Sequence, residues 1–236
     1  FPTRRSSDLG ISRADQDKFA LESQKRTAAA QQQGFFAKEI TPVAIPQRKG
    51  EAVIVDADEH PRASTTAEGL AKLKPVVKAD GTVTAGNASG INDGAAALLI
   101  ASDEAVEKYG LNARAKIVGA AAVGVEPRIM GFGPAPAIKK LLQQTGLTLE
   151  QMDVIELNEA FAAQALAVTR DLGLPDNAAH VNPNGGAIAI GHPLGASGAR
   201  LVATALNQLE LIQGRYALCS MCIGVGQGIA LIIERV

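Results

Sequence analysis

Short apolar runs alternate with helix-length segments along the second half of the chain. The runs of strand length lie at 115–125, 152–157, 185–190, 216–222 and 228–233. The segments of helical character lie at 134–145, 159–172 and 196–209. The strands are apolar on both faces, which is typical of a sheet covered on both sides by helices. The alternation therefore predicts a layered α/β fold.

The first part of the chain is more polar and more interrupted. Ser12 followed by Asp15 is a helix-capping pattern, and it predicts a helix over 13–33. Because this helix has few apolar residues, we expect it to lie on the surface. Residues 38–82 are broken by several prolines, which favours an extended insert with short strands such as 52–55.

Four other segments of the first half differ in character. Residues 82–90 and 93–100 are expected to form two buried strands joined by a tight turn, followed by a short helix over 102–109. Residues 1–9 show no helical or strand period, and they match one reading frame of a common sequencing-library adapter. We therefore expect residues 1–9 to be non-native and the reading frame to be truncated.

The overall composition excludes several classes of protein. The net charge of −1 gives no electrostatic reason to expect nucleic acid or an anionic membrane as partner. The longest uncharged apolar runs, such as 94–101, are far shorter than the roughly 20 residues of a membrane-spanning helix. Two cysteines are too few for a disulfide scaffold, and no signal peptide is visible, so we expect a reducing, cytoplasmic location.

One histidine stands in a glycine-rich segment at an expected helix start. Gly191 and Pro193 flank His192, and Gly195 and Gly198 follow it. An imidazole has an ordinary pKa of about 6.5 and exchanges protons near neutral pH, while a helix N-terminus favours developing negative charge. The ordinary alternative is a histidine that is simply hydrogen-bonded within a tight turn. The glycine setting favours a proton-transfer role.

Cys222 is the second candidate group, and Gly224 and Gly226 follow it. Free cysteine is most often a small buried hydrophobe. A redox pair with Cys219 is a further alternative, but a strand over 216–222 points the two side chains to opposite faces. A proton-transfer role is favoured because exposed amides of the glycine turn are suited to binding an oxyanion.

Asn158 and Glu159 fall where a predicted strand meets a predicted helix. Asn158 is interpreted either as a helix N-cap or as an amide aimed at a ligand or a water. Glu159 at such a junction is a candidate partner for a histidine, and the sequence leaves this open. His60, His180 and His192 lack the spacing of metal ligands, so we expect no metal site.

Several motifs together indicate a family. They are Asn158-Glu159-Ala160-Phe161, Gly191-His192-Pro193-x-Gly195-x-Ser197-Gly198, Cys222-x-Gly224-x-Gly226 and Gly86-Asn87-Ala88-Ser89-Gly90-x-Asn92-Asp93-Gly94. Their order and spacing resemble those of the thiolases, which cleave or form the carbon–carbon bond at the β-position of a 3-oxoacyl-CoA. Residues 215–228 look most similar to the 3-oxoadipyl-CoA thiolases of aromatic degradation, with acetoacetyl-CoA thiolase as the runner-up.

The resemblance covers nearly all of the chain after residues 1–9. It implies the layered α/β/α/β/α thiolase fold. It also implies a loop-domain part over 10–86, the end of an N-terminal domain over 87–112 and a C-terminal domain over 113–236. The full-length protein would be a homodimer or homotetramer.

The resemblance also assigns roles in the reaction. His192 would activate a nucleophilic cysteine and form part of an oxyanion hole for the thioester carbonyl. Asn158 would hold the water that completes this hole. Cys222 would move the proton to and from the α-carbon, and the backbone N–H of Gly224 would help to bind the second oxyanion.

Coenzyme A would be a co-substrate, with no cofactor bound permanently. Position matching implies contacts from Arg62 near the adenine and from Ala85 and Ser89 along the pantetheine arm. The alternative for Arg62 is an ordinary solvated charge. The nucleophilic cysteine of the family lies upstream of the loop domain, so we expect this polypeptide as written to be inactive and poorly stable.

The alternative from a different class is a non-catalytic, thiolase-like protein that binds acyl-CoA or lipid. Such a protein has no need of His192, Cys222 and Asn158. Their presence together favours the enzyme. An upstream cysteine on a strand-to-helix turn would support the enzyme further, and a serine or alanine there would support the binding protein.

Overall fold

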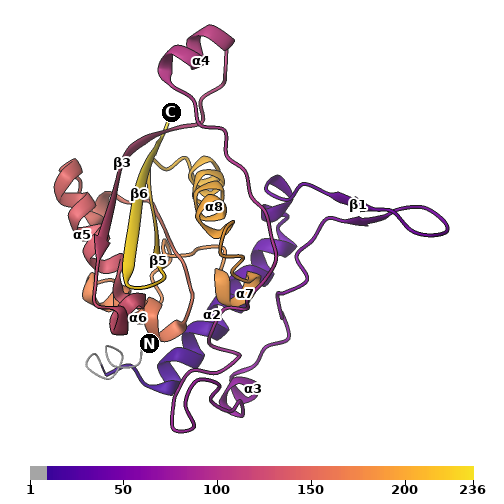
Figure 1. Cartoon of the computed structure of the whole chain (residues 1–236), viewed down its shortest axis with the longest axis vertical. Coiled ribbons are helices and arrows are strands. Elements are labelled where there is room, and N and C mark those ends of the chain that lie inside the picture. The colour runs from indigo at the N-terminus through magenta and orange to yellow at the C-terminus, as the bar shows by residue number, and fades with distance from the viewer. Residues whose placement is uncertain (1–9) are drawn as a thin grey trace.

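A four-stranded mixed sheet lies at the centre of the computed structural model, which describes residues 10–236 (Figure 1). Its strands are β3 (Ala115–Gly124), β4 (Val154–Leu157), β5 (Tyr216–Ile223) and β6 (Gln227–Arg235). Their order is β3-β6-β5-β4, with β5 antiparallel to β6 and parallel to β4. Four of the predicted strands are thus confirmed. The segment 1–9, which is predicted to be non-native, lies outside the described residues.

Helices cover both faces of this sheet, as the alternation predicts. α5 (Pro134–Thr145) and α6 (Ala162–Asp171) pack on one face, where Ile138 is buried against Leu218. α8 (Ser197–Ile212) packs on the other face with its own row of buried aliphatic side chains. Burial of such side chains on both faces stabilises the sheet through the hydrophobic effect. Among the described helices, none has the length and apolarity to cross a bilayer.

Helix α2 (Arg13–Gln32) begins where the capping pattern predicts, but its predicted surface position is wrong. The Ser12 hydroxyl accepts a hydrogen bond from Asp15 N, and the Asp15 carboxylate accepts one from Ser12 N. The helix packs against α6 and α7 (Ala187–Ile190). Its buried side chains are small or polar, namely Gln16, Asp17, Ala20, Ser23, Gln24, Thr27 and Ala30. Hydrogen bonds replace the apolar stripe that sequence patterns detect.

The segment after α2 holds only short elements. β1 (Val43–Ile45) and β2 (Val53–Val55) form an antiparallel hairpin that projects from the body of the molecule (Figure 1). The strand predicted at 52–55 is therefore confirmed. The other short elements of the chain are η1 (Phe35–Lys38), α3 (Ala67–Ala71), α4 (Asp103–Tyr109), η2 (Pro127–Phe132) and η3 (Leu149–Gln151).

The two buried strands predicted over 82–90 and 93–100 are wrong. Residues 91–102 have no regular secondary structure, and Leu99 and Ile100 are 84% and 66% exposed. A strand requires a partner for its backbone groups, and within residues 10–236 no strand lies beside this segment. An apolar composition alone is therefore not sufficient to make the segment a strand.

Two boundaries near the glycine motifs also differ from expectation. The predicted strand at 185–190 is instead the short helix α7, entered through the left-handed turn at Gly185 (φ 80°). The helix predicted from residue 159 begins only at Ala162. The preceding residues stay extended because they pair with the chain at 87–89, where Ser89 N donates to Ala160 O at 3.0 Å.

Candidate active site

The carboxyl ends of the parallel strands β4 and β5 carry Asn158 and Cys222. Asn158 directly follows β4, and its backbone N donates to Ser220 O of β5 at 2.9 Å. Its side chain is completely buried. Because the N-cap of α6 is Phe161, Asn158 is not a helix cap, and that alternative is wrong. Ligands of α/β proteins bind at this edge of the sheet, which makes it the candidate site.

His192 lies between α7 and α8 and reaches the same edge. Its Nε2 atom is 3.2 Å from Asn158 Nδ2, and its Nδ1 atom is 2.6 Å from Ser197 Oγ. The residue is 8% exposed. The structure thus brings together two of the predicted site residues, with Ser197 as a third member.

The backbone before the histidine is fixed by a close approach to Asn92. Gly191 has φ 92°, and a Cβ atom on it would lie 2.6 Å from Asn92 Cγ, so only glycine fits. The side-chain oxygen of Asn92 accepts a hydrogen bond from His192 N at 3.1 Å, and Gly90 O accepts a second one at 3.2 Å. The glycine in this motif therefore sets the position of the imidazole.

Burial and a nearby positive charge determine the protonation state of His192. Burial lowers the pKa of the imidazole, and the Arg200 guanidinium lowers it further. Both effects disfavour the imidazolium. The ring is consequently neutral near pH 7, which is the form that accepts a proton.

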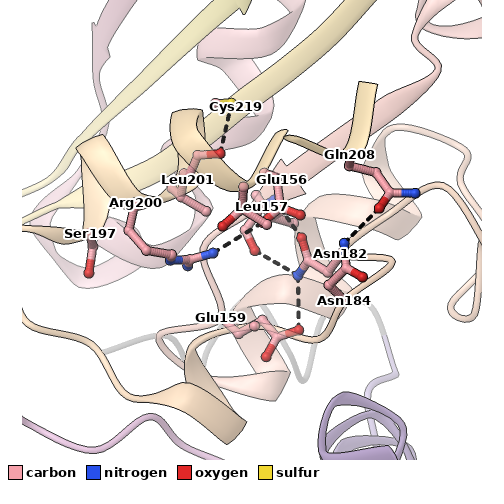
Figure 2. Close-up of polar contacts among 12 residues, drawn as sticks. Glu156, Leu157, Glu159, Asn182, Asn184, Ser197, Arg200, Leu201, Gln208 and Cys219 are labelled. Carbon is pink, nitrogen blue, oxygen red and sulfur yellow. Dashed lines mark hydrogen bonds and ion pairs between the residues drawn. The ribbon is translucent and has the colours of Figure 1, made fainter. Parts of the chain in front are cut away.

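Among residues 10–236, the hydrogen-bond partners of the Glu159 carboxylate include no histidine, so the pairing that the sequence left open is not formed. Its carboxylate accepts hydrogen bonds from Ser23 Oγ at 2.6 Å and Asn182 Nδ2 at 2.9 Å. It also accepts one from Ile188 N at 3.2 Å; Figure 2 shows the bond from Asn182. Burial raises the pKa of the carboxyl. Glu159 therefore ties α2 to the loop and short helix that precede His192.

The two cysteines lie on different faces of β5, as the strand pattern predicts. Cys219 packs under α8, where its Sγ donates to Leu201 O at 3.6 Å (Figure 2). The pleat turns Cys222 to the other face. Both thiols are free. Burial raises the pKa of Cys222 to about 11, so the thiol is protonated near pH 7.

The turn after Cys222 is exposed to solvent over residues 223–225. Gly224 is exposed, and a Cβ atom placed on it would meet no atom within 4 Å. Val225 and Gly226 follow with φ values of 70° and 106° and complete the turn between β5 and β6. In residues 10–236, no hydrogen bond links Cys222 or Gly224 to His192. They belong to the same sheet edge as Asn158, which contacts the imidazole.

A contact between the buried carboxyl of Glu156 and the partly buried guanidinium of Arg200 was not predicted from the sequence. Arg200 Nη1 of α8 lies 3.2 Å from Glu156 Oε2 of β4 (Figure 2). Burial raises the pKa of Glu156 to about 8, because the loss of hydration outweighs the attraction of Arg200. A single carboxylate inside an apolar strand is a signal that sequence reasoning can use.

The three residues matched to coenzyme A, Arg62, Ala85 and Ser89, differ in their surroundings. The side chain of Arg62 is exposed, and its backbone N donates to Gln24 Oε1 at 2.8 Å. Ala85 is exposed, whereas Ser89 is half-buried and its backbone bonds to Ala160 O. Ser89 therefore lies beside the chain that continues from Asn158, and nothing in the geometry joins Arg62 to it directly.

Comparison with known proteins identifies a family for this chain and shows what share of its relatives' length the chain spans. The profile described as "Thiolase, C-terminal domain" matches residues 111–235, and "Thiolase, N-terminal domain" matches residues 3–104. The Beta-ketoadipyl-CoA thiolase of Acinetobacter baylyi is 78% identical over 98% of this chain. The 3-oxoadipyl-CoA/3-oxo-5,6-dehydrosuberyl-CoA thiolase of Escherichia coli K12 is 61% identical over 97%. The chain spans 58% and 57% of the lengths of these two relatives.

Solved structures agree with the sequence relatives. A crystal structure of the Bacillus anthracis acetyl-CoA acetyltransferase has a TM-score of 0.94 at 44% identity, covering 99% of this chain and 58% of that one. Human mitochondrial 3-ketoacyl-CoA thiolase in complex with CoA has a TM-score of 0.93 at 49% identity, covering 99% and 57%. The predicted thiolase fold is confirmed, and the chain belongs to the thiolase family.

Proposed function

We propose that this chain supplies the acid–base part of an acyl-CoA:acetyl-CoA C-acyltransferase. The observation that carries the proposal is the buried contact between His192 Nε2 and Asn158 Nδ2 at 3.2 Å. It lies on the sheet edge that also carries Cys222. The proposed reaction is thiolysis or Claisen condensation of a 3-oxoacyl-CoA. The proposed substrate is 3-oxoadipyl-CoA, in aromatic degradation, which the names of the two relatives support.

In thiolysis, a nucleophilic cysteine adds to the 3-oxo carbonyl, and His192 Nε2 accepts the proton of that thiol. By the family resemblance, the nucleophilic cysteine lies upstream of the loop domain. Cys219 and Cys222 both belong to β5, so neither matches it. Breaking the bond between the α- and β-carbons leaves the enolate of acetyl-CoA, which takes the proton of Cys222. The thiol of a second CoA then attacks the acyl thioester and gives its proton to the Cys222 thiolate, while the nucleophilic cysteine leaves and takes back the proton held by His192. Condensation runs through the same steps in reverse.

Fixed donors lower the energy of the oxyanions in these steps. In the proposal, His192 and a water held by Asn158 face the thioester carbonyl, and the Gly224 amide faces the second oxyanion. Preorganised donors of this kind are worth about 3–4 kcal/mol each in other enzymes. The high pKa of Cys222, about 11, suits a group that donates a proton to an enolate.

The remaining parts of the proposal concern partners. Coenzyme A is a co-substrate that contacts Arg62, Ala85 and Ser89, and no cofactor is bound permanently. The human 3-ketoacyl-CoA thiolase with CoA bound supports a CoA site in this fold. We place the full-length protein in the cytoplasm as a homodimer or homotetramer. The two free thiols fit a reducing compartment.

A chimera tests the proposal. This chain replaces the matched segment of the Acinetobacter baylyi relative, and thiolysis of 3-oxoadipyl-CoA is measured. We expect turnover, and we expect His192→Ala and Cys222→Ala each to lower kcat by about 10²- to 10⁴-fold. Cys219→Ala, which removes the thiol on the other face of β5, is the matched control and should retain turnover.

Two outcomes would contradict the proposal. A folded chimera that binds CoA thioesters without turnover would favour the acyl-CoA-binding alternative. Full turnover by the His192→Ala chimera would remove the assigned base. The 236-residue polypeptide by itself is expected to show no thiolysis of acetoacetyl-CoA, because neither of its two cysteines matches the nucleophile.

A further inference from the structure

The first residue of α8, Ser197, holds one side of the His192 ring. Its side chain is buried, with 1% of the residue exposed. Its Oγ atom lies 2.6 Å from His192 Nδ1 and donates to Pro193 O at 3.0 Å. A carbonyl oxygen only accepts hydrogen bonds, and a hydroxyl has a single hydrogen to donate. Because that hydrogen goes to Pro193 O, Ser197 Oγ is left to accept a hydrogen from Nδ1.

The first turn of α8 holds the acceptor of the Ser197 hydroxyl in place. Pro193 O also accepts hydrogen bonds from Ala196 N and Ser197 N, each at 2.9 Å. The carbonyl is therefore held in place by backbone groups that do not depend on the histidine. The Ser197 hydroxyl has a fixed acceptor nearby whichever form His192 takes.

The contact on the opposite side of the ring, at Nε2, also supports hydrogen on Nδ1. Asn158 Nδ2, an amide donor, lies 3.2 Å from His192 Nε2. A donor at this position suits a ring nitrogen with a lone pair rather than one that carries hydrogen. Two contacts from different elements, α8 and the end of β4, thus point to the same tautomer.

We propose that Ser197 is a positioning residue that holds neutral His192 in the tautomer with hydrogen on Nδ1. Free histidine in water prefers the tautomer with hydrogen on Nε2, so the fold has to impose the other form. With hydrogen on Nδ1, the Nε2 lone pair faces Asn158 and the sheet edge. The tautomer is a property of the chain alone, and only its use as a base rests on the proposed function.

Nitrogen-15 NMR of the chimera tests the proposal. A His192→Gln sample assigns the ring signals of His192 among those of the other histidines. Above the pKa of His192, we expect a protonated-type shift for Nδ1 and an unprotonated-type shift for Nε2. Ser197→Ala should move the population toward hydrogen on Nε2, and Ser197→Thr, which keeps the hydroxyl, should restore it.

Thr204→Ala is the matched control. Thr204 is a buried hydroxyl on the same helix, but it donates to Glu39 at 2.9 Å instead of facing the ring. Its removal should leave the His192 tautomer unchanged. The wild-type spectrum is decisive even if a variant does not fold, because hydrogen on Nε2 in the wild type overturns the proposal. An unchanged tautomer in folded Ser197→Ala also overturns it.

Kinetics in the chimera separates this inference from the proposed function. Ser197→Ala should lower kcat by about 10- to 100-fold with little change in KM, because the base is mispositioned while the substrate contacts remain. The expected NMR result in a chimera without turnover would support the tautomer and contradict the function. Unchanged kcat in Ser197→Ala despite a shifted tautomer would contradict the positioning role.

Discussion

Glu156 and Arg200 bring a buried carboxyl and a guanidinium together, behind the strand end that carries Asn158. Glu156 is fully buried, and burial raises the pKa of its carboxyl to about 8 despite the guanidinium 3.2 Å away. The folded protein therefore binds this proton more tightly than the unfolded chain does. The contribution of Glu156 to the unfolding free energy is fully present below pH 4.5, the ordinary pKa of the carboxyl. It is lost as the pH rises through about 8.

Glu156→Gln should remove this pH dependence. We measure the unfolding free energies of the wild type and of Glu156→Gln by urea denaturation. As the pH rises from 5 to 9, the value of the wild type should fall relative to that of Glu156→Gln. Glu210→Gln is the control. Arg114 lowers the pKa of Glu210 below its ordinary value of 4.5, so this carboxylate stays ionised in the folded and the unfolded chain from pH 5 to pH 9. The difference between the wild type and Glu210→Gln should therefore stay constant over this range. A wild-type-to-Glu156→Gln difference that stays constant across this range would contradict the burial argument.

For single residues, the sequence predicted part of the site and missed the rest. His192, Cys222 and Asn158 were detectable because glycine turns and a strand-to-helix junction mark them locally. Ser197 stood in the motif without a role, since its contact with the imidazole depends on how α8 begins. Glu156 was undetected for a related reason, because its partner Arg200 comes from a distant element.

Helix α2 is the element whose attachment the sequence did not reveal. Ser23 donates to the Glu159 carboxylate at 2.6 Å and accepts from Gly186 N at 3.1 Å. A polar helix face of this kind carries no apolar periodicity. The predictions for the strands and covering helices of the central sheet were confirmed because their apolar periods are clear. The strand predicted at 93–100 was wrong because a strand forms through pairing with a neighbour, not through composition alone.

Ser23→Ala should loosen the approach to the site as well as destabilise the fold. We expect a loss of about 1–3 kcal/mol, because Glu159 keeps its burial but loses a donor. Hydrogen exchange at the amides of 186–192 should accelerate. Ser12→Ala removes only the cap of α2, which should lower the unfolding free energy by about 0.5–2 kcal/mol. After correction for this loss of stability, the exchange rates at 186–192 should match those of the wild type. Equal exchange in both variants would show that Ser23 does not hold this loop.

At the scale of the whole molecule, one sheet edge collects groups from several elements. Asn158 follows β4, Cys222 ends β5, and His192 enters from the loop before α8. The layered architecture was predictable from alternating segments, whereas this convergence follows from the parallel pairing of β4 with β5. The central claim is that these groups exchange a proton with the α-carbon of a CoA thioester.

Deuterium incorporation into acetyl-CoA tests that claim most directly. The chimera is incubated with acetyl-CoA in D₂O, and the mass of the acetyl group is followed without any acyl acceptor. We predict incorporation by the parent chimera and by Cys219→Ala, and its loss in Cys222→Ala. Incorporation that persists in folded Cys222→Ala, or its absence from a parent chimera that binds acetyl-CoA, would contradict the account.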